Sequence, residues 1–83
     1  MFENERIRAR RISKRPGERV PMHYVPPSLM VFLSDSASRF TDPDGKTWDE
    51  IAKAGEIRWW PGGRVQVEVL SGRDVEFIMV EPL

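Results

Sequence analysis

The sequence contains two stretches bounded by turn residues, Gly17-Glu-Arg-Val-Pro-Met-His23-Tyr-Val-Pro26 and Gly55-Glu-Ile-Arg-Trp-Trp-Pro61-Gly-Gly63. In each stretch, glycine or proline encloses a short run rich in β-branched and aromatic residues, which is typical of a strand between two turns. Seven prolines and six glycines punctuate the whole chain in the same way. We therefore expect short strands joined by turns.

Seven candidate strands lie between the turn signals, at residues 6–13, 19–24, 28–33, 38–41, 56–60, 64–70 and 75–80. The run Val65-Gln-Val-Glu-Val69 alternates strictly between apolar and polar residues, as a half-buried strand does. The run Leu29-Met-Val-Phe-Leu33 is apolar on both faces, so we expect it to lie between the core and a second covering layer. This organisation indicates an all-β sandwich or barrel.

The two turn-bounded stretches resemble the two motifs of the cupin family. The first cupin motif is Gly, five residues, His-x-His, three or four residues, Glu; the second is Gly, five residues, Pro-x-Gly, two residues, His, three residues, Asn. Matching positions here hold Gly17, His23, Gly55, Pro61 and Gly63. The resemblance implies an all-β fold, a small cupin-type jelly-roll barrel (a double-stranded β-helix, RmlC-like), with residues 1–83 as a single domain.

Residues 47–55 fit either a strand or a helix. Thr47 followed three residues later by Glu50, with Gly55 at the end, has the signature of a capped two-turn helix. Helices this short are marginal without packing, and the resemblance places a strand here, after the Asp44-Gly45 turn. We favour the strand.

Most metal-binding side chains of the cupin motifs are missing. The second His position holds Val25, the Glu position falls on Leu29 or Met30, and the late His position holds Gln66. One imidazole among aliphatic and amide side chains is a poor transition-metal site. Even with Glu68, the set offers two protein ligands, fewer than the three usual in catalytic zinc sites. We expect a degenerate metal site and no cofactor.

The resemblance implies that His23 points into the barrel. Alternate strand residues share a face, so Val25 points inward with it, and if Gln66 points inward then so does Glu68. Adjacent tryptophans face opposite sides, and Arg58 shares a side with Trp60. We expect a largely apolar ligand pocket lined by Val25, Met30 or Leu29, Phe32, Trp59, Gln66 and Glu68.

His23 is the candidate catalytic residue, because histidine is the usual group for proton transfer near neutral pH. The opposing interpretation is that it is only hydrogen-bonded to a backbone group. We expect a metal-free protein that binds a small hydrophobic or aromatic ligand, either as a binder alone or as an isomerase, cyclase or lyase. The alternative is a non-enzymatic structural or regulatory dimer whose barrel is filled by Met30, Phe32 and Trp59. A metal-dependent dioxygenase is less expected.

Composition limits the partners. The 83 residues have a formal net charge of zero and no cysteine, so disulfides and thiolate metal sites are excluded. Residues 1–19 hold seven Lys or Arg and three Glu, a net of +4 that we interpret as a solvated strand or a subunit contact. We expect a cytoplasmic protein with no nucleic-acid or membrane partner. Its small size and the apolar rows Leu29–Leu33 and Val65/Val67/Val69 favour a homodimer.

Overall fold

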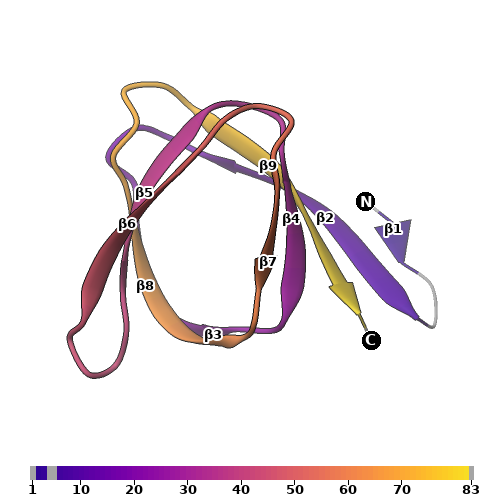
Figure 1. Ribbon diagram of the computed structural model, residues 1–83, viewed down its shortest axis with the longest axis horizontal. Helices are drawn as coiled ribbons and strands as arrows, with labels where there is room; N and C mark the ends of the chain where they lie inside the picture. Colours follow the sequence, from indigo (N-terminus) through magenta and orange to yellow (C-terminus); the bar gives the residue numbers. More distant parts are fainter. Residues whose placement is uncertain (1, 4–5, 83) are drawn as a thin grey trace.

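The computed structural model of the chain describes residues 2–3 and 6–82, and all of their regular secondary structure is β-strand (Figure 1). The strands are β1 (Phe2–Glu3), β2 (Ile7–Lys14), β3 (Arg19–Val25), β4 (Ser28–Phe32), β5 (Ser36–Thr41), β6 (Thr47–Ala52), β7 (Ile57–Trp60), β8 (Gly63–Val69) and β9 (Val75–Pro82). Each predicted strand is present within a few residues of its expected bounds. Residues 47–52 form a strand, which confirms the choice made over a helix.

The strands form two antiparallel sheets, one of five strands in the order β1-β2-β9-β4-β7 and one of four in the order β3-β8-β5-β6. From β2 onward the chain changes sheet at every connection except β5–β6, so successive strands wrap around a common interior (Figure 1). This arrangement is a jelly roll. Strand β1 and the start of β2 extend beyond the barrel, beside the end of β9.

The motif glycines have a backbone role. Gly17 and Gly55 both adopt positive φ, 74° and 90°, in the turns that precede β3 and β7. A residue with a Cβ is strained there, whereas glycine is not. The Gly17 amide donates to the Val69 carbonyl at 3.1 Å and the Gly55 amide donates to the Phe32 carbonyl at 2.8 Å, so each turn is tied to another strand.

The main cluster of buried apolar side chains lies between the two sheets. It consists of Phe32, Ala52, Val69, Val75, Phe77 and Met79. The Phe32 and Phe77 rings, which are paired across β4 and β9, lie 5.7 Å apart between centroids. Burying an aliphatic or aromatic side chain of this kind contributes about 1.5–3 kcal/mol to folding.

A β-bulge in β3 determines which of its side chains face inward. Val20 pairs with Val67 and His23 pairs with Val65, so β3 advances three residues while β8 advances two. The extra residue keeps both Val20 and His23 on the inner face, although an odd number of positions separates them.

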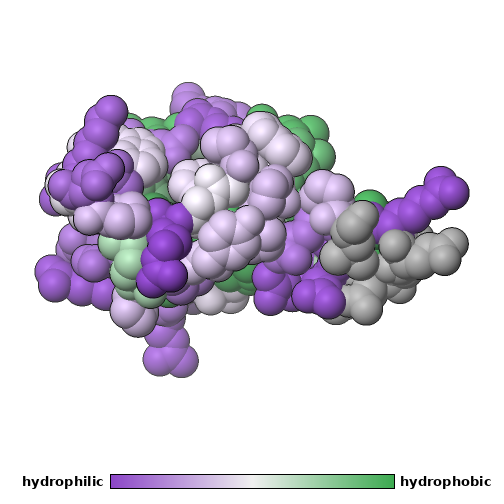
Figure 2. All heavy atoms as spheres, turned by 90° about the horizontal axis from the view of Figure 1, so that it is seen from below, coloured by the Kyte–Doolittle hydropathy of each residue, from purple (hydrophilic) through white to green (hydrophobic). Residues whose placement is uncertain are grey.

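The exterior differs from one side of the molecule to another. On the face seen in Figure 2, hydrophilic side chains gather toward the ends and residues of intermediate hydropathy occupy the middle. Among the described residues, no helix is long and apolar enough to cross a membrane. A cytoplasmic location stays a prediction.

Candidate functional site: a cavity inside the barrel

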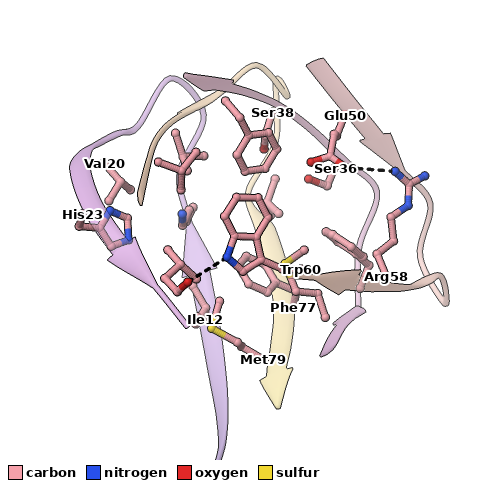
Figure 3. A pocket seen from close by; sticks show the side chains of 18 of the residues that line it. Ile12, Val20, His23, Ser36, Ser38, Glu50, Arg58, Trp60, Phe77 and Met79 are labelled. Carbon is pink, nitrogen blue, oxygen red and sulfur yellow. Dashed lines mark hydrogen bonds and ion pairs between the residues drawn. The ribbon is translucent and has the colours of Figure 1, made fainter. Parts of the chain in front are cut away.

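The two sheets enclose a cavity of about 410 Å³. The five-stranded sheet contributes Arg10, Ile12, Lys14, Met30, Phe32, Arg58, Trp60, Val75, Phe77 and Met79, and the four-stranded sheet contributes Val20, His23, Tyr24, Val25, Ser36, Ser38, Phe40, Glu50, Val65 and Val67. Pro26 completes the lining. Most of these side chains are apolar, and Trp60 and Phe77 lie together in the middle of the view in Figure 3.

Each sheet contributes an aromatic ring, Phe40 or Trp60, to a stacked pair that lines the cavity. Phe40 stacks on Trp60 with ring centroids 6.2 Å apart and planes inclined by 20°, and on its other neighbour, Trp48, at 5.7 Å and 18°. The indole Nε1–H of Trp60 donates to the Val25 carbonyl at 3.0 Å, which fixes the ring within the cavity (Figure 3). A tryptophan whose N–H has a hydrogen-bond partner can present its ring to an apolar space without leaving that donor unsatisfied.

His23 lies where the cavity meets the surface. Both His23 and its neighbour Tyr24 line the cavity, yet His23 is exposed and Tyr24 is 59% exposed, so the cavity opens beside them. His23 Nδ1 lies 2.8 Å from the Pro21 carbonyl. A carbonyl can only accept a hydrogen bond, so Nδ1 carries the proton and Nε2 is the acceptor of the neutral ring.

Arg58 and Glu50 form a polar cluster at another part of the lining. The Arg58 guanidinium donates to Glu56 at 2.8 Å and to the Ile51 carbonyl at 2.6 Å, and it lies 3.7 Å from Glu50. The hydrogen bond from Arg58 holds the pKa of the Glu56 carboxyl below its ordinary value. The positive charge of Arg58 is therefore compensated within the protein by carboxylates.

Two other cations line the cavity from β2. Arg10 is paired with Glu81 at 2.5 Å, and the Glu81 side chain is almost fully buried. Lys14 takes part in none of the ion pairs or hydrogen bonds found among the described residues. Its Nζ lies 5.9 Å from the centroid of the Phe77 ring. Burial lowers the pKa of Lys14, and the neighbouring Glu18 offsets this only in part.

The structure places four of the seven predicted site residues in the cavity lining. They are His23, Val25, Met30 and Phe32. Their roles in ligand binding or catalysis stay predictions. His23 does have the backbone hydrogen bond of the opposing interpretation, and that bond leaves its second nitrogen available.

Trp59, Gln66 and Glu68 were wrongly placed inside the barrel. Trp59 pairs with Leu29 on the outer face and is 56% exposed, whereas Trp60 lines the cavity. Gln66 is exposed opposite Thr41, and Glu68 pairs on the outside with Arg19 at 3.5 Å.

The inward positions of β8 belong to the valines. Val65, Val67 and Val69 are buried, with 2%, 7% and 2% exposure. The motif spacing therefore assigned the inward positions of β8 one residue away from where they lie. An error of one residue in a strand interchanges its inward and outward side chains.

The donor set does not fit a cupin metal ion. The inward positions next to Gln66 are Val65 and Val67, so the shift in phase supplies no imidazole. Among the described residues, no group of three or more His, Cys, Asp or Glu side chains lies close enough to hold an ion. His23 is the one borderline nitrogen ligand in the lining, and aliphatic side chains surround it.

Sequence reasoning missed much of the lining. Ile12 and Lys14 on β2 and Phe77 and Met79 on β9 were not predicted, although alternation in Val75-Glu-Phe-Ile-Met79 would have found the latter pair. Ser36, Ser38 and Glu50 are short or polar residues that carry no such signal in the sequence.

Known structures share this architecture, although no family model and no curated protein matches the chain. A cupin domain from Bordetella pertussis matches 99% of this chain and 86% of its own length, with a TM-score of 0.87 and 19% identity. An RmlC-like cupin with a double-stranded β-helix fold from Methanocaldococcus jannaschii matches 98% of this chain and 73% of its own, with a TM-score of 0.66 and 20% identity. A predicted oxalate decarboxylase from Thermotoga maritima matches 90% and 65%, with a TM-score of 0.59 and 25% identity. The chain has the double-stranded β-helix fold of the cupins, as its two motifs implied.

Proposed function

We propose that the protein binds a small hydrophobic or aromatic molecule, without a metal ion, in the barrel cavity. The observation that carries the proposal is the cavity itself. Its volume of about 410 Å³ lies within the range of about 300–1,000 Å³ that is usual for small-molecule sites. A barrel filled by its own side chains, which is the alternative, would leave no such space.

The lining supports an apolar ligand. Phe40, Trp60 and Phe77 offer flat ring faces, and Met30 is a flexible side chain that adapts to ligand shape. Val65 and Val67 of β8 add apolar surface beside Phe40, the cross-strand neighbour of Val67. Such a surface gains free energy from burying apolar area, and the scattered polar groups would fix the orientation of the ligand.

His23 is the group that we propose for acid–base chemistry, if the ligand is transformed. Its Nδ1–H is bound to the Pro21 carbonyl, which fixes the tautomer and leaves Nε2 able to accept a proton. Its place at the mouth gives it access to both ligand and solvent. Reactions that need only proton transfer, such as those of isomerases, cyclases and lyases, suit a lone imidazole. We expect His23→Gln to lower any such activity about 10²- to 10⁴-fold.

The test of ligand binding uses N-phenyl-1-naphthylamine, a neutral fluorescent probe for apolar sites. We expect saturable binding to the wild type and its loss in Val67→Phe, which fills the cavity from β8. Gln66→Phe is the matched control, because it adds the same ring one residue away on the outer face. Ser38→Leu narrows the cavity from β5 and covers the case in which Val67→Phe does not fold.

Three outcomes would overturn the proposal. One is a wild type that does not bind the probe. The second is an equal loss of binding in Val67→Phe and Gln66→Phe. The third is stoichiometric metal in protein purified without a His tag, which would contradict the metal-free part.

We propose in addition that two copies pair through the outer face of the five-stranded sheet. Cross-strand neighbours there form two largely apolar rows, one of Trp59, Leu29 and Val80, the other of Ile57, Val31 and Ile78. Trp59 and Ile57 are 56% and 62% exposed, which is unusual for such large apolar side chains in a contiguous group.

The expected occupant of this face is a second copy of the chain. A stable interface buries about 800 Å² per partner, roughly a seventh of the 5516 Å² accessible surface of this molecule. The face also bears both signs of charge in the pair Arg11–Glu76, so a two-fold contact can match it with itself. Light scattering at micromolar concentration tests this pairing, and a monomer would contradict it.

A further inference from the structure

We propose that the ligand of the cavity is a small apolar or aromatic acid whose carboxylate pairs with the ammonium group of Lys14. This inference rests on the proposed function and names the chemical class of its ligand. The inference depends on which of the cations that line the cavity contact carboxylates of the protein.

All but one of the permanent cations that line the cavity are compensated by the protein. Arg10 pairs with Glu81, and Arg58 contacts Glu56, Glu50 and a backbone carbonyl. Lys14 has no such partner among the described residues, although Glu18 lies near enough to act on it through space. Lys14 is thus the lining cation without a direct carboxylate contact, and it is held by a strand rather than by a mobile loop.

The surroundings of Lys14 are apolar. On β2 it follows Ile12 at the next inward position, and its cross-strand partner on β9 is the fully buried Val75. Its nearest aromatic neighbour is Phe77. An ammonium group in such a place loses hydration, and the through-space effect of Glu18 offsets that loss only in part. The depressed pKa of Lys14 has this loss as its first cause.

A ligand carboxylate would supply the missing counter-charge. A charge-assisted hydrogen bond in a space of low polarity is stronger than the same contact in water, and it would favour the charged form of Lys14. The apolar part of the ligand would then occupy the space between Phe77, Met30 and Trp60. Neutral and cationic analogues lack this pairing, so they should bind less tightly.

The experiment compares phenylacetate, 2-phenylethanol and phenethylamine by isothermal titration calorimetry at neutral pH. We expect the wild type to bind phenylacetate about ten-fold more tightly than 2-phenylethanol, and phenethylamine least tightly. In Lys14→Met the preference for the acid should disappear, so that phenylacetate binds no more tightly than 2-phenylethanol. Lys14→Arg should retain the preference.

Arg64→Met is the matched control, because it removes one positive charge from an exposed position on β8 outside the cavity lining. It should bind phenylacetate as the wild type does. Equal losses in Lys14→Met and Arg64→Met would indicate general electrostatic attraction and would overturn the inference.

The outcomes separate the two proposals. If 2-phenylethanol binds as tightly as phenylacetate, the carboxylate partner of Lys14 is wrong, while binding of apolar molecules in the cavity stands. If none of the three probes binds at millimolar concentration, the inference fails, and the N-phenyl-1-naphthylamine titration decides whether the proposed function fails with it. The comparison of the uncharged 2-phenylethanol with phenylacetate thus tests the carboxylate partner, and the fluorescent probe tests the cavity.

Discussion

The outer faces of the two sheets differ in composition, because the four-stranded sheet carries a charged row and the five-stranded sheet carries apolar rows. Across the four-stranded sheet, Arg19, Glu68, Arg39 and Asp49 are cross-strand neighbours on successive strands, so charges alternate in sign along the row. Two of its contacts are ion pairs, of 3.5 Å between Arg19 and Glu68 and 2.8 Å between Arg39 and Asp49. Opposite charges on facing strands stabilise a sheet modestly and keep its surface hydrated.

The equivalent positions of the five-stranded sheet are mostly apolar. The row of Trp59, Leu29 and Val80 crosses β7, β4 and β9 without a charge. Strand β4 is thus apolar on both faces, as its sequence indicated, but among residues 2–3 and 6–82 a covering layer lies only on its inner side. The four-stranded sheet has a charged exterior, whereas the apolar exterior of the five-stranded sheet is the face that we propose for pairing.

The largest expected effect concerns the proposed pairing of two copies. Trp59→Lys places a charge at the end of the apolar row on the edge strand β7, and a two-fold contact would suffer the change twice. Loss of a tryptophan anchor costs about 2 kcal/mol or more in an interface, so we expect at least a thirty-fold weaker dimer by sedimentation equilibrium. Gln66→Lys makes the same charge on the other sheet and should leave association unchanged. A Trp59→Lys protein that remains dimeric would show that the copies meet elsewhere.

The second prediction contrasts the two faces of one strand. Val67 is buried in the cavity wall and Gln66 is exposed, although they are adjacent on β8. Val67→Asp buries a carboxylate without a partner, so we expect it to lower the free energy of unfolding by about 3–5 kcal/mol or to prevent folding. Gln66→Asp should change it by about 0.5 kcal/mol or less. Urea denaturation measures both, and similar effects would contradict the orientation of β8.

Strand β8 also shows how much of the structure could be predicted from the sequence. Strand positions, the choice of a strand for residues 47–52 and the inward direction of His23 all followed from turn residues, alternation and the motif spacing. Gln66 was placed inward because the motif counts residues from Pro61, although the plain alternation of valines with polar residues indicates the opposite. Local alternation was the better predictor, because the apolar residues of an alternating strand mark its buried face. A count from a motif assigns the wrong face when it is off by a single residue.

Lys14 could not have been recognised from the sequence. A lysine near the end of a strand most often lies in solvent, and its neighbours along the chain are Ser13 and Arg15. We propose a role for it because Arg10 and Arg58 contact carboxylates, whereas Lys14 has no ion pair among residues 2–3 and 6–82. Such pairings join residues far apart in the chain, and only the folded structure reveals which cation is left over.

The smallest expected effect belongs to the charged row. Arg39 forms a bidentate contact with Asp49, at 2.8 and 3.2 Å, and its hydrogen bonds hold the pKa of that carboxyl below the ordinary value. Because the folded-state pKa is the lower one, the stabilisation is complete above the unfolded pKa of about 3.9 and is lost as the pH falls through the folded value. Both side chains are exposed, so the effect should be small.

Thermal melts in acid measure this contribution. Between about pH 5 and pH 2 the wild type should lose slightly more stability than Asp49→Asn, whose amide cannot be protonated in that range. Asp74→Asn is the control, because Asp74 is exposed and has no ion pair among the described residues. If Asp49→Asn and Asp74→Asn shift the acid limb of the melting curve equally, the row gains nothing from its pairing. The charges of the four-stranded sheet would then keep its surface hydrated without stabilising the fold through cross-strand pairing. The two sheets would differ in the solubility of their outer faces and not in the stability that their cross-strand pairs provide.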